Sequence, residues 1–272
     1  MELSIDCLII EASRKCNMKC RHCLRGAPQR KTIDNRYIHK LMGMIDYIGS
    51  VQIGGGEPTL AMDTLEYIRQ CIAYGSVDVG NFCMVTNGKA INVEKLAEFF
   101  YDMYCVCSDN ELSHIGFSFD PFHIETFNWA QKEKQERNFQ RLADKMLYDY
   151  CMEKNEGQGD LVRKHSDKTW GYRGLIREGR AVDMGTREAP VYMFEESEYS
   201  DTIHFNDTEL YLSATGYLIA GCNFSYHSID TRKDIRIAHI DDIHCAEDLI
   251  KAMQAYNERQ QTSNQDQESL VA

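Results

Sequence analysis

The chain has 272 residues, 43% of them hydrophobic and 26% charged, and a net charge of −12. This length can bury a sizeable core, as one large domain or as a domain with an appendage. Residues 191–272 hold 15 acidic and 5 basic side chains, which argues against binding to a nucleic acid backbone. No apolar run approaches the roughly 20 residues that cross a bilayer, and the first residues lack the features of a secretory signal. We therefore expect a cytoplasmic protein that binds neither membrane nor nucleic acid.

Residues 1–190 alternate predicted strands and helices. Runs of β-forming residues predict the strands, and apolar residues at helical spacing predict the helices. Repeated strand–helix units predict an α/β fold with a parallel sheet, in which ligands bind at the carboxyl ends of the strands. The strands are expected over 4–10, 50–53, 81–88 and 114–120, the helices over 35–48, 62–75, 92–104 and 125–154, and residues 174–181 close the series.

The pattern changes after residue 190. Residues 202–226 alternate β-forming residues around Ala-Thr-Gly and predict a hairpin. A helix is expected over 245–260. We divide the chain into a core (1–190), a smaller C-terminal segment (191–257) and a polar, disordered tail (258–272).

Three cysteines lie close together in the sequence. Cys16, Cys20 and Cys23 fall within eight positions. Three thiolates can hold zinc with an open position, can form a disulfide with a spare thiol, or can hold an iron–sulfur cluster in which one iron lacks a protein ligand. Structural zinc usually takes four ligands, and His22, between two of the cysteines, is awkwardly placed to be the fourth. The scattered cysteines, expected to be small buried hydrophobic residues, are Cys7, Cys71, Cys83, Cys105, Cys107, Cys151, Cys222 and Cys245.

The spacing CxxxCxxC at residues 16–23 resembles that of the radical S-adenosylmethionine superfamily. One strand–helix unit later, Gly55, Gly56, Glu57 and Pro58 match the GGEP motif of that superfamily. The motif follows a predicted strand, where glycines let the backbone approach a ligand closely. The two motifs together favour this superfamily over an ordinary glycine-rich turn.

Three later segments, each weak alone, resemble superfamily segments at strand ends. Their order along the chain extends the resemblance over roughly residues 5–190. They are 84–88 with Thr86 and Asn87 near the ribose, 117–123 with Ser118 and Asp120 near the methionine moiety or substrate, and 175–181 with Arg180 in a GRA segment of peptide-modifying members.

The resemblance implies a partial (β/α)6 TIM-like barrel with a small C-terminal cap of a β-hairpin and a helix. It also implies that Cys16, Cys20 and Cys23 ligate one 4Fe–4S cluster whose fourth iron is chelated by S-adenosylmethionine. Reductive cleavage would then yield a 5′-deoxyadenosyl radical that abstracts hydrogen from a C–H bond. His22 would lie near the adenine, and the GGEP residues near the methionine amino group. No catalytic residue of the later chemistry can be chosen.

The substrate class is less determined than the cofactor. The GRA segment and a hairpin similar to that of SPASM and twitch extensions favour a peptide or protein side chain, with a small molecule or nucleotide as the alternative. A sensor that binds zinc or an iron–sulfur cluster is the non-enzymatic alternative. Several roles remain open for the basic residues around the cysteines: offsetting cluster charge, guiding S-adenosylmethionine, binding phosphate, docking a flavodoxin or ferredoxin, or simple solvation. These residues are Arg14, Lys15, Lys19, Arg21, Arg25, Arg30 and Lys31.

The C-terminal segment departs from the SPASM pattern. Cys222 stands alone, and the next cysteine, Cys245, lies in a predicted helix. A second cluster would have to recruit Cys105 and Cys107 as well. We therefore expect a metal-free cap.

Overall fold

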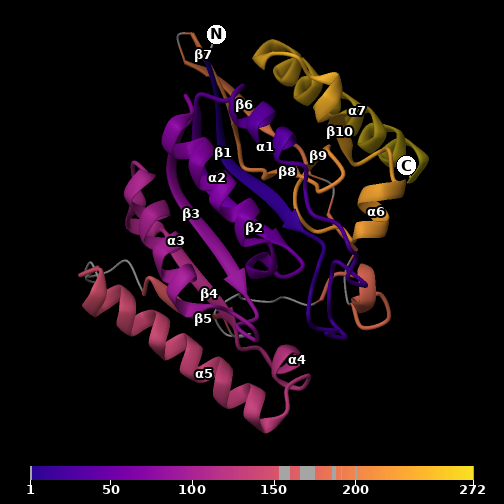
Figure 1. Ribbon diagram of the computed structural model, residues 1–272. Coiled ribbons are helices and arrows are strands. Elements are labelled where there is room, and N and C mark those ends of the chain that lie inside the picture. The colour runs from indigo at the N-terminus through magenta and orange to yellow at the C-terminus, as the bar shows by residue number, and fades with distance from the viewer. Residues whose placement is uncertain are drawn as a thin grey trace.

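The computed structural model describes residues 2–152, 160–165, 175–185, 188–190, 192–199 and 201–271, with side chains to residue 263. A twisted sheet runs through the molecule, with its strands in the order β10-β9-β8-β1-β2-β3-β4-β5 (Figure 1). The strands β1 to β5 are parallel to their neighbours, as predicted. Their bounds are β1 Glu2–Ser13, β2 Tyr47–Gly55, β3 Asp78–Thr86, β4 His114–Ser118 and β5 Val162–His165.

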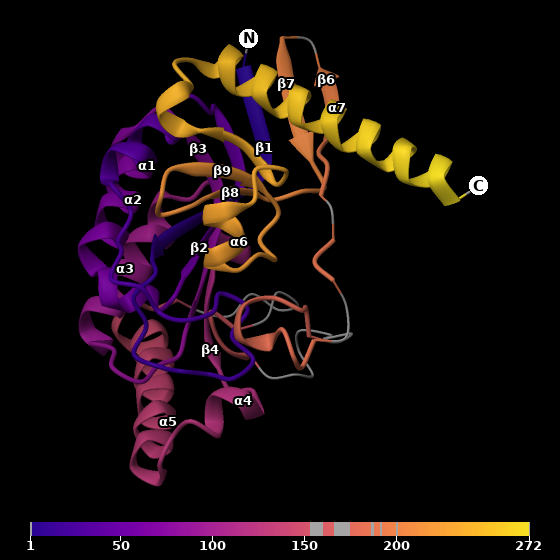
Figure 2. The same cartoon turned by 90° about the vertical axis from the view of Figure 1, so that its right-hand side faces the viewer.

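Helices α1, α2, α3 and α5 lie along one face of this sheet (Figure 2). Alternate residues of β1 explain the two layers: Leu8 and Ile10 pack into the large core shared with these helices, whereas Ile9 packs in a smaller cluster with Ile229 of α6. The α/β fold class with a parallel central sheet is therefore confirmed. The helices are α1 Asn35–Met42, α2 Met62–Tyr74, α3 Val93–Val106, α4 Pro121–Ile124, α5 Trp129–Asp144, α6 Tyr226–Thr231 and α7 Ala246–Val271.

Local sequence fixes several helix ends. Asn92 accepts a hydrogen bond from the backbone of Lys95 and so caps α3. Asn128 and Gln131 form a reciprocal capping box at the start of α5. The helix predicted over 35–48 ends at Met42, because the chain from Tyr47 pairs with β1. Residues 179–181, at the end of the segment expected to close the strand–helix series, form a 3₁₀ turn that contacts the loop with the three cysteines (residues 14–26, the cysteine loop).

The C-terminal segment continues the sheet from the free edge of β1. The predicted hairpin is present as β8 and β9, and its first strand pairs parallel to β1. A second hairpin pairs with the earlier part of β1. Helix α7 runs through the tail that was expected to be disordered. No described helix is long and apolar enough to span a membrane. The added strands are β6 Glu195–Tyr199, β7 Thr202–Asn206, β8 Leu210–Leu212, β9 Tyr217–Ala220 and β10 Arg236–His239.

A buried ion-pair network joins this segment to the end of β1. Arg14 is fully buried; its Nε donates to Glu11 at 2.7 Å, and its two terminal nitrogens donate to Asp230 of α6 at 2.5 and 2.9 Å. The guanidinium also lies over the ring of Tyr226, 4.6 Å from its centroid. The other oxygen of Glu11 accepts from the backbone of Ala214 in the β8–β9 turn. The residue that begins the cysteine loop is thus held by the C-terminal segment.

We expect Arg14→Ala to lower the free energy of unfolding by about 3–5 kcal/mol, because it leaves the buried Glu11 carboxylate without its cation. Urea denaturation of the metal-free protein measures this change. The control is Arg36→Ala, which removes an exposed pair with Asp34 and should leave the midpoint unchanged. A loss below about 1 kcal/mol for Arg14→Ala would contradict the role given to this network.

Candidate functional site

A cavity of about 610 Å³ lies at the carboxyl ends of the central parallel strands. This is where ligands bind in sheets of this kind. The structure brings most of the predicted site residues to its wall. The predicted residues in the lining are Cys16, Cys20, His22, Cys23, Gly55, Gly56, Glu57, Pro58, Asn87, Ser118 and Arg180; Thr86 and Asp120 are not part of it.

The glycines of the GGEP segment let two backbones meet. The N–H groups of Gly56 and Glu57 donate to the carbonyls of Ser13 and Lys15 at 2.7 and 2.8 Å. Gly55 has φ +118°, and a Cβ there would lie 2.2 Å from the Ser13 carbonyl oxygen. A Cβ on Gly56 would lie 2.3 Å from that of Lys15. The first part of the cysteine loop therefore rests directly on this turn.

The carboxylate of Glu57 joins the ends of β2 and β3. One oxygen accepts from the hydroxyls of Thr59 and Thr86, both at 2.6 Å, and the other accepts from the backbone N–H of Asn87 at 2.8 Å. Burial raises the pKa of Glu57, and these hydrogen bonds act in the opposite direction. The Glu57 side chain thus holds the turn after β2 to the end of β3, and Glu57 is also part of the cavity lining.

Two buried amides of α5, which sequence reasoning missed, hold the next turns. Gln135 Nε2 donates to the carbonyls of Asn87 and Ser118, at 2.8 and 2.9 Å, and Asn138 donates to that of Gly88. The Asn87 side chain donates in turn to Asn17 in the cysteine loop at 2.8 Å. One feature of the sequence could have indicated this role: Gln135 and Asn138 are three residues apart, which places both amides on one face of α5.

The GRA segment holds the second part of the cysteine loop. The backbone N–H of Arg180 donates to the carbonyl of Cys23 at 2.9 Å. Gly179 has φ +58°, and a Cβ there would lie 2.2 Å from the Leu24 carbonyl oxygen. This close approach explains why the segment forms a turn.

Burial, the largest cause, raises the pKa of Cys16 to about 11, with smaller contributions from Glu57 and the two other thiols.

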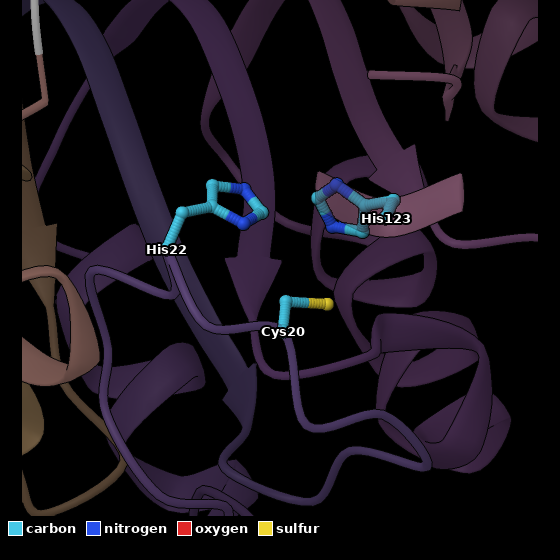
Figure 3. Close-up of side chains that lie close together, drawn as sticks. All are labelled: Cys20, His22 and His123. Carbon is cyan, nitrogen blue, oxygen red and sulfur yellow. The ribbon is translucent and has the colours of Figure 1, made fainter. Parts of the chain in front are cut away.

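Cys20, His22 and His123 converge at one side of the cavity (Figure 3). One ligand atom from each lies within 4.8 Å of the others. Burial, the largest cause, and the nearby His123 together lower the pKa of His22 to about 4. Burial also opposes protonation of His123, but hydrogen bonds with Asp120 and Cys20 prevail and raise its pKa to about 10. His123 was not among the predicted site residues, although it ends the segment that supplied Ser118 and Asp120.

Two donor sets therefore share Cys20. The three thiols line one cavity and suit an iron–sulfur cluster. Cys20 with the two histidines is a donor set that zinc also accepts. Two buried cavity atoms, Nδ1 of His22 and Nε of Arg180, make no hydrogen bond within the described parts of the chain. Unsatisfied polar atoms beside a cavity fit a polar ligand that completes the site.

The remaining cysteines do not assemble into a second centre among the described residues. Cys222 lines the cavity, whereas Cys105 and Cys245 are exposed. The basic residues near the thiols divide into two groups. Arg14 and Arg25 are held by the C-terminal segment, the second by a 2.7 Å hydrogen bond to the Phe224 carbonyl and by stacking over Tyr211. Lys15, Lys19, Arg21, Arg30 and Lys31 are exposed.

No protein-family model matches the sequence, and no curated protein matches it either. The structure of native anSMEcpe with bound AdoMet and Cp18Cys peptide aligns with a TM-score of 0.50 and 14% identity, over 94% of this chain and 84% of that one. The crystal structure of Streptococcus suis SuiB bound to precursor peptide SuiA gives a TM-score of 0.34 and 11% identity, over 85% and 61% of the two chains. At 14% identity, the first likeness shows that the chain shares the fold of anSMEcpe.

We expect Gly55→Ala to displace the cysteine loop, because the new Cβ meets the Ser13 carbonyl and the positive φ costs about 1–3 kcal/mol in strain. In the metal-free protein, the melting temperature should fall, and the buried Cys20 thiol should be alkylated faster, as followed by mass spectrometry. The matched control is Gly54→Ala, whose Cβ would lie 3.8 Å from its nearest neighbour, a methyl group of Ile9. Equal alkylation rates in the two variants would contradict this account.

Proposed function

We propose that the chain is a radical S-adenosylmethionine enzyme. One observation carries the proposal: a turn with the GGEP sequence is hydrogen-bonded to the loop that holds three thiols, and both line one cavity at the strand ends. The fold shared with anSMEcpe supports the proposal, because the anSMEcpe structure contains bound AdoMet. The competing hypothesis is a zinc site formed by Cys20, His22 and His123. This hypothesis gives Cys16 and Cys23 no role.

Cys16, Cys20 and Cys23 would hold a 4Fe–4S cluster with one iron free of protein ligands. When bound and reduced, the cluster would supply the electron for cleavage of S-adenosylmethionine and so give access to hydrogen abstraction from a C–H bond of the substrate. The half-buried thiols and the apolar contacts of Cys20 with Met18 and Phe127 limit access of water to the reaction.

The other cavity residues would bind and orient S-adenosylmethionine. The backbones of Gly55, Gly56 and Glu57 border the cavity and suit its amino group. Pro58, Ser118 and Asn87 extend this wall. His22 stacks on Phe122 with ring centroids 4.7 Å apart, so its own ring is held for contact with an adenine. The free Nε of Arg180 can donate to a carboxylate or ribose oxygen.

The substrate that this proposal favours is a peptide or protein side chain. The structure of anSMEcpe contains a peptide as well as AdoMet. In this chain Tyr226 of α6 and Asn223 of the segment before it contribute to the cavity wall. A basic surface lies beside the thiols and consists of the exposed Lys19, Arg21, Arg30 and Lys31. We expect an acidic electron donor, such as a flavodoxin or ferredoxin, to bind to this surface. We expect the enzyme to act in the cytoplasm.

Anaerobic reconstitution tests the ligand set. The wild-type protein should bind about four irons, with the broad visible absorbance of a 4Fe–4S cluster. Replacing Cys16, Cys20 or Cys23 with Ala should remove this absorbance, since each thiolate is a ligand. Cys222→Ala and Cys245→Ala are controls that should retain it. If the protein binds zinc, and the zinc is retained when Cys16 or Cys23 is replaced but lost when His22 is replaced, the result would support the competing hypothesis.

The reaction itself is tested with dithionite and S-adenosylmethionine. The reconstituted protein should form 5′-deoxyadenosine, detected by liquid chromatography and mass spectrometry. Candidate peptides and small molecules labelled with deuterium would identify the substrate by transfer of deuterium into this product. An intact cluster that yields no 5′-deoxyadenosine would remove the enzymatic claim.

A further inference from the structure

We propose that Arg25 and Tyr226 form an anion site in the cavity wall that binds a carboxylate of the substrate. The inference rests on the proposed function, because that function makes this cavity the place where the substrate lies. It names a chemical feature of the substrate that the proposed function leaves open.

Arg25 brings to the cavity wall a positive charge that no carboxylate pairs with among the described residues. Its guanidinium has five N–H donors, and one nitrogen donates to the Phe224 carbonyl at 2.7 Å. The central carbon of the group lies 4.7 Å from the centroid of the Tyr211 ring. These two contacts hold the guanidinium in place and leave further N–H groups for a ligand.

Tyr226 supplies a neutral donor next to this cation. Its backbone N–H donates to the Arg25 carbonyl at 3.1 Å, where α6 lies against the cysteine loop (Figure 1). Tyr226 lines the cavity, yet only 2% of its surface is exposed, and its hydroxyl makes no hydrogen bond within the described parts of the chain. A buried hydroxyl without a partner is unfavourable, so one at a cavity wall indicates a ligand that accepts from it.

The charges around the cavity favour an anion. Among the lining residues that the structure describes, the only carboxylate is that of Glu57, and hydrogen bonds already hold both of its oxygens. Arg14 is paired with two carboxylates. Arg25 and Arg180 are the lining guanidinium groups that have no carboxylate partner in the described residues. S-adenosylmethionine has one carboxylate, which Arg180 can receive, so Arg25 suits an anion of the substrate.

The position of Arg25 also favours the substrate over the cofactor. Strand β1 lies between β2, which leads into the GGEP turn, and β8 of the C-terminal segment. Arg25 is held by Phe224 and Tyr211 of that segment, on the other side of β1 from the turn proposed for the methionine group. One guanidinium and one hydroxyl match a carboxylate, which carries a single charge and accepts at two oxygens.

Binding of small carboxylates tests the proposal on the reconstituted, oxidised protein saturated with S-adenosylmethionine, whose own carboxylate is then already bound. N-acetylaspartate N-methylamide presents a side-chain carboxylate, and N-acetylglycine presents a terminal one. Each acid is compared with its neutral amide analogue by saturation-transfer NMR. At least one acid should bind about tenfold more tightly than its amide, because the amide lacks the charge that pairs with Arg25.

Two variants should weaken binding of that acid. Arg25→Gln should weaken it about tenfold, since the charge is lost while the new amide can still donate to the Phe224 carbonyl. Tyr226→Phe removes only the hydroxyl and should weaken binding about fivefold. The melting temperature of Tyr226→Phe should not fall, because the hydroxyl has no partner in the folded chain. A purely structural role of Tyr226 predicts unchanged binding.

Arg236→Gln and Tyr217→Phe are the matched controls. Arg236 also donates to a backbone carbonyl, that of Ile229, and its guanidinium carbon lies 3.7 Å from the centroid of the Tyr217 ring. Neither Arg236 nor Tyr217 lines the cavity. Both variants should bind the acid as the wild type does.

Unchanged binding in Arg25→Gln and Tyr226→Phe would overturn the proposal, as would acids that bind no better than their amides. If Arg25→Gln weakened the binding of S-adenosylmethionine in place of the acids, the carboxylate would be that of the cofactor, and the proposal would also fall. A wild-type protein that forms no cluster would remove the proposed function and the assignment to a substrate. The same titrations on the metal-free protein would then show whether the anion site itself stands.

Discussion

The site depends on how closely the backbone of the cysteine loop approaches the turn after β2. The carbonyls of Ser13, the last residue of β1, and of Lys15 in the loop lie where side chains on Gly55 and Gly56 would otherwise be, and two hydrogen bonds fix the contact. The buried carboxylate of Glu57 then joins this turn to the end of β3 by accepting hydrogen bonds from Thr86 and Asn87. The positions of the thiols therefore follow from the sheet itself, and the loop needs no regular structure of its own.

The C-terminal segment is part of the same construction. It continues the sheet from β1, and its α6 supplies the carboxylate that receives Arg14. Arg25 is anchored in the same segment through the carbonyl of Phe224. The basic residues near the thiols therefore fall into two groups: Arg14 and Arg25 join the loop to the C-terminal segment, and the others are exposed.

Local signals predicted much of the fold. The helix over 62–75 ends as expected at Gly75, and the predicted strands pair in parallel as β1 to β4, whereas β5 was not predicted. The helix predicted over 35–48 failed at its second half, because pairing of residues from Tyr47 with β1 outweighed an apolar pattern that also suits a helix. The motifs located the cavity wall. The support that Gln135 gives to it was not predictable, since that role depends on which distant carbonyls the folded chain brings to α5.

The central claim is that three thiols hold a cluster with one iron open to a small ligand. Electron paramagnetic resonance of the reduced, reconstituted protein, recorded with and without S-adenosylmethionine, tests it most directly. The account predicts a 4Fe–4S signal whose g-values shift when S-adenosylmethionine binds to the open iron. A protein that binds only zinc, or a cluster whose signal is unaffected by saturating S-adenosylmethionine, would contradict it.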